Sequence, residues 1–288
     1  MALKDTKAKE NVKLNIKFYL LTSLAVIFLL IANSALWVNR VIFNTNNFSE
    51  ITAASLLSES SRKAVSSEVV DQALSERPVL KSLAEERATN FISSLLKTSQ
   101  VENSVNKVSS KLQLAFTSNN NQNIEFDLSG IKQTTTNLIN LSNNNNLSEK
   151  IESSSVPDKI TLLDTSKLPK FYNLGTLFMW LAPITFILGV LILAYPHIKQ
   201  KKILNNLLWR QGLIVLLGYL LGLLLGPLFR PLILSQFKNI NLRVVAENLY
   251  NSFVGSFNSQ IQLMLFLGLT MVLVPLFTNL HKSLNKNK

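Results

Sequence analysis

Residues 211–229 read QGLIVLLGYLLGLLLGPLF, and this stretch decides the class of the fold. It lacks Asp, Glu, Lys and Arg, and Gly218, Gly222 and Gly226 recur at every fourth residue. As a helix it would extend about 28 Å at 1.5 Å per residue, close to the roughly 30 Å of hydrocarbon in a bilayer. The stretch therefore predicts a membrane-spanning helix with glycines along one face.

Three other stretches have the same character, at residues 18–38, 174–195 and 260–280. None contains Asp, Glu, Lys or Arg, and each is long enough to span a bilayer as a helix. The first follows a basic tail, as the core of a cleaved signal peptide would, but its apolar run is longer than such cores, which favours an uncleaved anchor. We therefore expect an all-α membrane protein with four transmembrane helices.

The charged residues are divided unequally among the segments between these spans. Residues 1–17, 196–210 and 281–288 carry five, four and three basic residues against two acidic ones. Residues 39–172 carry fourteen of each, and residues 230–259 carry three basic residues and one acidic residue. Because basic segments beside spans stay in the cytoplasm during insertion, we expect a multi-pass protein of the plasma membrane with both termini inside and a large domain, residues 39–172, outside.

Membrane lipids are accordingly the first expected partners. Near an anionic membrane surface each basic residue contributes about 1 kcal/mol of attraction. The net charge of +12 would suggest nucleic-acid binding in a soluble protein, but here the excess lies beside apolar spans, so no nucleic-acid partner is expected. The residues predicted to contact headgroups and set the topology are Lys13, Lys17, Lys199, Lys201, Lys202, Arg210 and Lys282.

No residue pattern predicts catalysis. The chain has no Cys, and its two histidines, His197 and His281, lie at span ends without nearby carboxylates. It has neither a glycine loop for phosphate nor the spacing of a nucleophile elbow. The predicted spans contain no ionisable side chain of the kind that marks proton relays and ion paths, which argues against a secondary transporter or a voltage-gated channel. We expect no enzyme, and no catalytic residue, cofactor or metal ion.

The predicted outer domain is mainly helical. Asn47 or Ser49 is suited to cap a first short helix, and Pro78 to begin a third one, where its missing N–H is not needed. Two short stretches have strand character and could pair antiparallel, although a two-stranded ribbon alone is marginal. In chain order, the expected elements are helices near residues 51–57, 60–74, 78–96 and 101–116, a strand at 124–128, a helix at 129–141 and a strand at 159–163.

The loop at residues 230–259 predicts an amphipathic helix. Val245, Leu249, Phe253 and Phe257 recur at every fourth residue, with polar side chains elsewhere on the wheel. Such a helix would lie at the membrane surface or under the outer domain.

The glycine face of the third span has two interpretations. Small residues let helix backbones approach closely in lipid, where the hydrophobic effect does not drive association. Gly218, Gly222 and Gly226 are therefore predicted to pack against the second or fourth span, or else to form the seam of a homo-oligomer or of a complex with a partner's membrane helix. Pro227 is expected to kink or end this helix.

Four stretches resemble a group of uncharacterised bacterial integral membrane proteins, common in actinobacteria and related lineages. They are residues 69–74 (VVDQAL), 124–128 (IEFDL), 156–162 (VPDKITL) and 244–257 (VVAENLYNSFVGSF). The resemblance implies one N-terminal span, a helical outer domain and three C-terminal spans in the plasma membrane. It implies no catalytic residue and no ligand.

A second resemblance is to ABC-transporter permeases that have one helix, a large outer domain and three further helices. It rests on the Leu/Gly-rich residues 212–226. Such permeases contact their ATPase through an amphipathic coupling helix, and residues 196–210 offer only Ile203, Leu204, Leu207 and Leu208 as an apolar face.

Two functions remain open on these grounds. The first is a non-enzymatic role in envelope organisation, binding or sensing, in which the outer domain contacts an envelope protein or a wall polymer. The alternative is a permease-type subunit of an ABC transporter or mechanotransmission complex partnered by a cytoplasmic ATPase.

Overall fold

The chain is an all-α membrane protein with one small two-stranded element. The computed structural model describes residues 2–73, 78–117, 124–127, 159–163, 172–199 and 204–286. Four helices are long and apolar enough to cross a membrane, as predicted, and make this a multi-pass protein. They are α1 (Ala2–Trp37), α8 (Tyr172–Lys199), α9 (Leu204–Leu234) and α10 (Ile240–Lys286).

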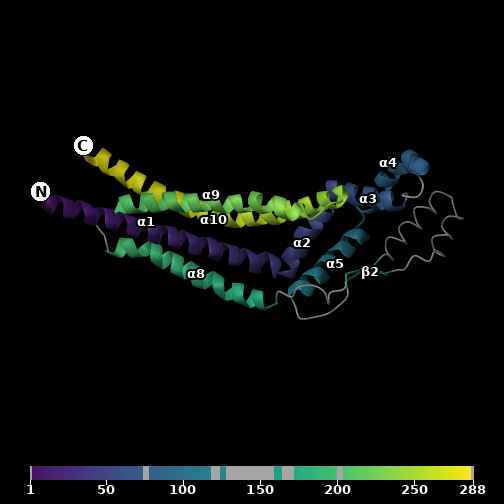
Figure 1. Cartoon of the computed structure of the whole chain (residues 1–288), viewed down its shortest axis with the longest axis horizontal. Helices are drawn as coiled ribbons and strands as arrows, with labels where there is room; N and C mark the ends of the chain where they lie inside the picture. The colour runs from purple at the N-terminus through teal and green to yellow at the C-terminus, as the bar shows by residue number, and fades with distance from the viewer. Residues whose placement is uncertain are drawn as a thin grey trace. The chain divides into compact units, whose positions relative to one another are not determined.

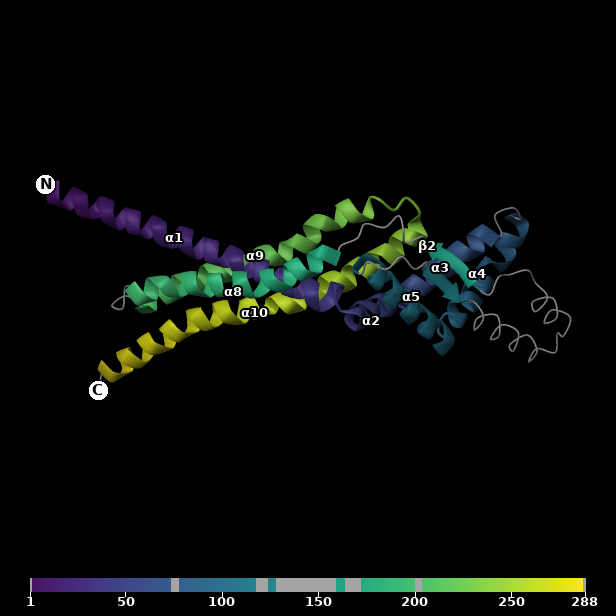
Figure 2. The ribbon, with the colours of Figure 1, turned by 90° about the horizontal axis from the view of Figure 1, so that it is seen from below.

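These helices belong mainly to one compact unit, which we call the membrane unit. It comprises Met1–Asn39, Thr176–Phe229 and Gly255–Lys288, and its helices run alongside one another in Figures 1 and 2. Large apolar side chains such as Trp180, Leu191 and Leu221 are exposed on its surface, which is the pattern of a lipid-facing bundle. Its buried core consists of Ala25, Val26, Leu29, Leu193, Val215, Ile261 and Met264.

The second compact unit, which we call the head unit, comprises Arg40–Gly175 and Arg230–Val254. In it, α2 packs along α5 and α3 along α4, while β1 lies beside α5. Its described helices and strands are the π-helix Val38–Ile42 in part, α2 (Thr45–Leu56), α3 (Glu59–Ala73), α4 (Pro78–Leu95), α5 (Ser99–Thr117), β1 (Ile124–Asp127), β2 (Lys159–Leu163), the first residues of α8, the last residues of α9 and the first part of α10.

The predicted pair of strands is confirmed. β1 and β2 pair antiparallel, with Phe126 opposite Ile160 and Asp127 opposite Lys159. The register shifts between Ile124 and Glu125. The helix predicted at residues 129–141 lies outside the described residues.

Two of the predicted helix ends in the head unit can be compared with the structure. Pro78 is the first residue of α4, as expected. The cap of α2 is Asn44, not Asn47 or Ser49, because the Asn44 side chain accepts a hydrogen bond from the Asn47 N–H. The helix thus begins at Thr45, six residues before the predicted range of 51–57.

Pro227 does not end α9, contrary to one of the two expectations for this residue. The helix continues through Pro227 and Pro231 to Leu234. A proline removes one backbone donor, and membrane helices tolerate this loss where neighbouring groups satisfy the freed carbonyl.

The predicted amphipathic helix and the predicted fourth span, expected as two elements, form one helix. α10 is a single helix from Ile240 to Lys286, and its length of about 70 Å at 1.5 Å per residue far exceeds the thickness of a bilayer. Ile240–Val254 belongs to the head unit and the remainder to the membrane unit.

Candidate functional site

The first turns of α10 are attached to α3 by a cluster of amide and hydroxyl side chains in the head unit. Asn239 caps α10, because its Oδ1 accepts hydrogen bonds from the backbone N–H groups of Asn241 and Leu242 at 2.8 and 3.2 Å. Its Nδ2 donates to Glu68 Oε2 of α3 at 2.7 Å, and Asn241 Nδ2 donates to the same oxygen at 3.1 Å. One carboxylate therefore holds both amides at the start of the helix.

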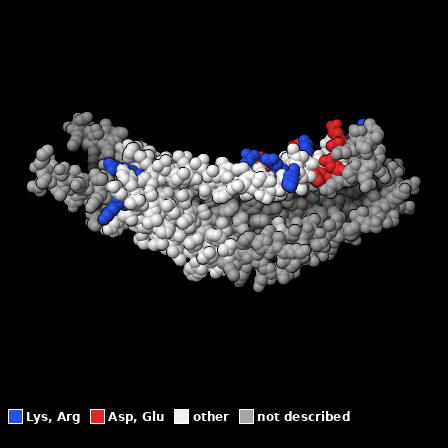
Figure 3. Space-filling view, in the orientation of Figure 1, with Lys and Arg blue, Asp and Glu red and all other residues white. Residues whose placement is uncertain are grey.

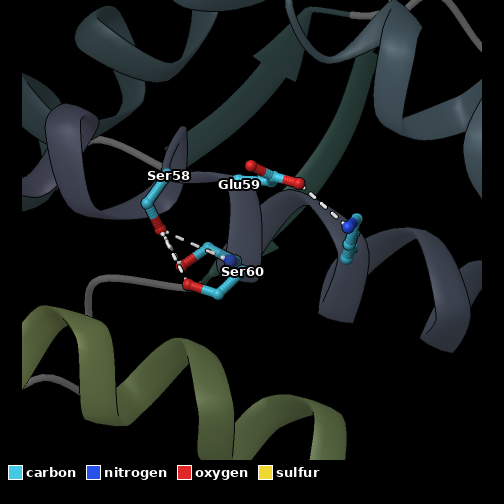
Figure 4. Close-up of polar contacts among 5 residues, drawn as sticks. Ser58, Glu59 and Ser60 are labelled. Atoms are coloured by element: carbon cyan, nitrogen blue, oxygen red, sulfur yellow. Dashed lines mark hydrogen bonds and ion pairs between the residues drawn. The ribbon is translucent and has the colours of Figure 1, made fainter.

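Two turns further along α10, Asn248 reaches the beginning of α3. Its Nδ2 lies 2.7 Å from Ser60 Oγ, 2.9 Å from Ser61 Oγ and 3.4 Å from Ser58 Oγ. Ser61 is fully buried, and Ser58 Oγ donates to it at 3.0 Å. Figure 4 shows the hydroxyls of Ser58 and Ser60 turned toward one another. We call Asn239, Asn241 and Asn248 with Glu68, Ser58, Ser60 and Ser61 the α3–α10 network.

The charged side chain between these serines plays a separate role. Glu59 forms an ion pair with Lys63 one turn along α3 at 2.9 Å, visible in Figure 4. The hydrogen bond from Lys63, together with its charge, holds the pKa of Glu59 below its usual value. Both side chains are exposed, so this pair contributes little to stability, and it is not part of the α3–α10 network.

Two further contacts bind α10 within the head unit. Phe253 packs against Phe48 of α2 with ring centroids 5.5 Å apart. Glu247 forms an ion pair with Arg230 at the end of α9. Val245, Leu249 and Phe253 are half-buried, so the predicted apolar stripe of residues 245–257 packs within the protein over this part of α10.

A buried amide side chain connects α5 to the segment that follows the first membrane helix. α1 continues into a π-helix, Val38–Ile42, and α2 begins three residues later. Gln113 of α5 is almost fully buried, and its Nε2 donates to the backbone carbonyl of Ile42 at 2.9 Å. Its Oε1 accepts from Thr45 Oγ1 at 2.9 Å, so one side chain joins α5 to both sides of this connection.

Sequence reasoning missed the α3–α10 network and Gln113. The asparagines of α10 and the serines of α3 are common surface residues about 180 positions apart, and nothing local shows that they meet. Gln113 was the one detectable signal, because it lies within the helix predicted at residues 101–116, next to the apolar Leu112. A buried polar side chain needs a hydrogen-bond partner, but the sequence does not show which residue that partner is.

In the membrane unit, the glycines of α9 lie against side chains of the same chain. A Cβ on Gly218 would clash with Val26 Cγ1, and one on Gly222 would clash with Ile261 Cδ1. Gly226 is also buried. The nearest side chains at Gly218 and Gly222 thus come from α1 and α10. α10 contains the fourth span, one of the two predicted partners, whereas the contact with the first span was not predicted.

A polar contact joins α8 to α9 in the membrane unit. Gln211 is fully buried, and its Nε2 donates to the Leu193 carbonyl at 3.1 Å. Its Oε1 lies 2.6 Å from His197 Nε2. With the amide in this orientation, His197 must donate through Nε2. His197, near the end of α8, therefore has a hydrogen-bond partner in α9, which the sequence did not indicate.

The other predicted site residues are basic. Lys17 is exposed and Arg210 is half-buried. Lys13, Lys199 and Lys282 lie within α1, α8 and α10, while Lys201 and Lys202 lie outside the described residues. Within the described ranges, His, Asp and Glu form no group of three or more that could hold a metal ion.

Comparisons with known proteins add no family. The sequence matches no protein-family model, no curated protein and no solved structure at a significant level. The two resemblances noted above therefore rest on sequence patterns alone.

The α3–α10 network leads to a first testable prediction. Replacing Asn248 by Leu removes the amide that donates to Ser60 and Ser61, and should lower the stability of the full-length protein by about 1–2 kcal/mol. In detergent this corresponds to a fall in melting temperature of several degrees. Asn251, which is exposed on the same helix, supplies the matched control, and Asn251→Leu should leave the melting temperature nearly unchanged. Equal melting temperatures for the two variants would contradict a structural role for the network.

Proposed function

We propose that this protein is a non-enzymatic, multi-pass protein of the plasma membrane whose head unit lies outside the cell. In this proposal the head unit binds an envelope protein or a wall polymer, and the membrane unit anchors it. Both termini and the loop between α8 and α9 would be cytoplasmic, as the charge distribution indicates.

The observation that carries the proposal is the division of α10 between the two units. The helix contributes Ile240–Val254 to the head unit and Gly255–Lys286 to the membrane unit. The α3–α10 network holds the first of these segments. A domain built around the end of a membrane helix is suited to sensing, because a change in how α3 packs acts directly on a membrane helix.

The surface of the head unit offers apolar side chains for recognition. Val69 of α3 and Phe91 of α4 are each nearly half exposed. Because residues 39–172 carry equal numbers of acidic and basic residues, shape and apolar contact would have to supply most of the affinity.

Photo-crosslinking in living cells tests this proposal with the complete protein. We expect a photoreactive phenylalanine analogue at Phe91 to form an adduct with a wall polymer or an envelope protein. The same analogue at Val101, which is buried in α5, is the matched control and should form none. An absence of adducts at both Phe91 and Val69 would overturn the binding role.

A parallel experiment tests the alternative that the protein is a permease-type subunit. Copurification with a cytoplasmic ATPase, lost when Lys201 and Lys202 are changed to Glu, would replace the proposed function with a transporter subunit. A reporter fused after Lys288 tests the topology independently. It should behave as cytoplasmic, and an extracellular signal would overturn the assigned orientation.

A further inference from the structure

The connection between α9 and α10 exposes a group of apolar side chains, which we call the α9–α10 tip. Ile240 is 77% exposed, the largest value among the bulky apolar residues described. The tip consists of Leu232, Ile233, Phe237, Ile240 and Leu242. The apolar stripe predicted for this loop follows in α10 and is half-buried, whereas the exposed apolar side chains lie at the turn, where none were predicted.

The tip begins within the apolar span of α9, because Leu232 and Ile233 are among the last residues of Leu207–Leu234. Leu224, Leu228 and Leu232 recur at every fourth residue, and all three are exposed. The apolar part of the helix, Leu207–Leu234, has 28 residues and is therefore about 42 Å long. A bilayer measures about 30 Å across its hydrocarbon and 40–45 Å with its headgroups. A helix of this length is long enough to extend from one headgroup layer to the other.

The charges around the tip are mainly positive. Figure 3 shows Lys and Arg side chains gathered over the end of α9 and the beginning of α10. Arg230 is neutralised by its ion pair with Glu247. Lys238 and Arg243 are exposed, and neither forms an ion pair within the described part of the chain. The nearby carboxylate of Glu68 is held by the amides of the α3–α10 network.

We propose that the α9–α10 tip inserts into the headgroup layer of the bilayer and binds anionic lipid. The apolar side chains lie at the boundary with the acyl chains, and Lys238 and Arg243 contact headgroup phosphates. Exposed apolar residues flanked by cations are the combination that holds protein segments at an anionic membrane surface. The tip thus provides a lipid contact in addition to the basic residues predicted from sequence.

Because the chain contains no Cys, a single label can be placed at the tip. We expect an environment-sensitive fluorophore on Ile240→Cys, in full-length protein reconstituted into vesicles of phosphatidylcholine with phosphatidylglycerol, to be quenched by lipid-borne nitroxide. Aqueous iodide should quench it several-fold less than the same fluorophore on Phe91→Cys, a comparably bulky exposed position on α4. Equal iodide quenching at the two positions would overturn the proposal. Protection from iodide without quenching by the lipid nitroxide would also overturn it, because a protein would then cover the tip.

The charge component is tested separately. The double variant Lys238→Glu with Arg243→Glu should reduce protection of the label several-fold in anionic vesicles. Lys107→Glu with Lys111→Glu on α5 makes the same change of charge and should have no effect. Equal protection in vesicles with and without phosphatidylglycerol would exclude anionic lipid as the ligand. These readouts need no envelope partner, so they can fail while the proposed function stands.

Discussion

Replacing Gly212 by Ala should destabilise the membrane unit, whereas replacing Gly255 by Ala should not. A Cβ at Gly212 would lie 2.9 Å from the Gly268 carbonyl oxygen and 3.0 Å from the Val272 nitrogen. These are backbone atoms of α10, so they cannot rotate away and the two helices must separate. Such overpacking typically costs about 1–3 kcal/mol, only partly offset by the gain of up to about 1 kcal/mol for alanine over glycine in a helix.

Gly255 is the matched control within the same helix pair. A Cβ there meets no atom within 4 Å, so Gly255→Ala adds helix propensity without a clash. We expect the two alanine variants to change the melting temperature in detergent in opposite directions. Gly212→Val should lower it further than Gly212→Ala, because two more methyl groups must be accommodated. A Gly212→Ala protein as stable as the parent would contradict the close crossing of α9 and α10.

Gln113→Leu should destabilise the head unit by about 1–3 kcal/mol. The substitution keeps a side chain of similar size but removes the donor to the Ile42 carbonyl and the acceptor for the Thr45 hydroxyl. Leaving polar groups without partners in a largely buried site costs about this much. The π-helix Val38–Ile42 loses a contact at its last residue, so the loss of order should concentrate there.

Hydrogen exchange measured by mass spectrometry on the full-length protein resolves this effect. Peptides covering residues 38–45 should exchange faster in Gln113→Leu, while peptides of α9 should remain unchanged. Gln100→Leu, at an exposed position of the same helix, is the control and should leave both sets unchanged. Unchanged exchange at residues 38–45 in Gln113→Leu would show that this amide does not hold the connection.

Membrane helices were the most predictable part of this fold. A helix that crosses hydrocarbon must satisfy its own backbone hydrogen bonds and carry apolar side chains, so length and composition identify it without tertiary information. The ends were less predictable. α10 extends from the predicted fourth span back to Ile240, because the polar residues of its first part are satisfied within the head unit.

The partners of the glycine face could not be predicted from the sequence, for a different reason. Spacing alone indicates that helices can approach closely at Gly218 and Gly222, but every membrane helix presents an apolar surface that could fill the groove. Val26 of α1 and Ile261 of α10 occupy it here. In the sequence, neither residue can be distinguished from the other apolar residues of the spans, because only its position in the bundle places it beside a glycine.

Local chemistry in the sequence by itself determined the helical class, the four membrane helices, the start of α4 at Pro78 and the two strands. Each of these depends on neighbouring residues, through backbone satisfaction in lipid, ring geometry or side-chain alternation. Only the tertiary structure decided that α10 is shared by two units, that Asn248 and Gln113 are attachment points, and that apolar side chains remain exposed at the α9–α10 tip. These features depend on residues far apart in the chain, and polar pairing or burial at such distances leaves no local pattern.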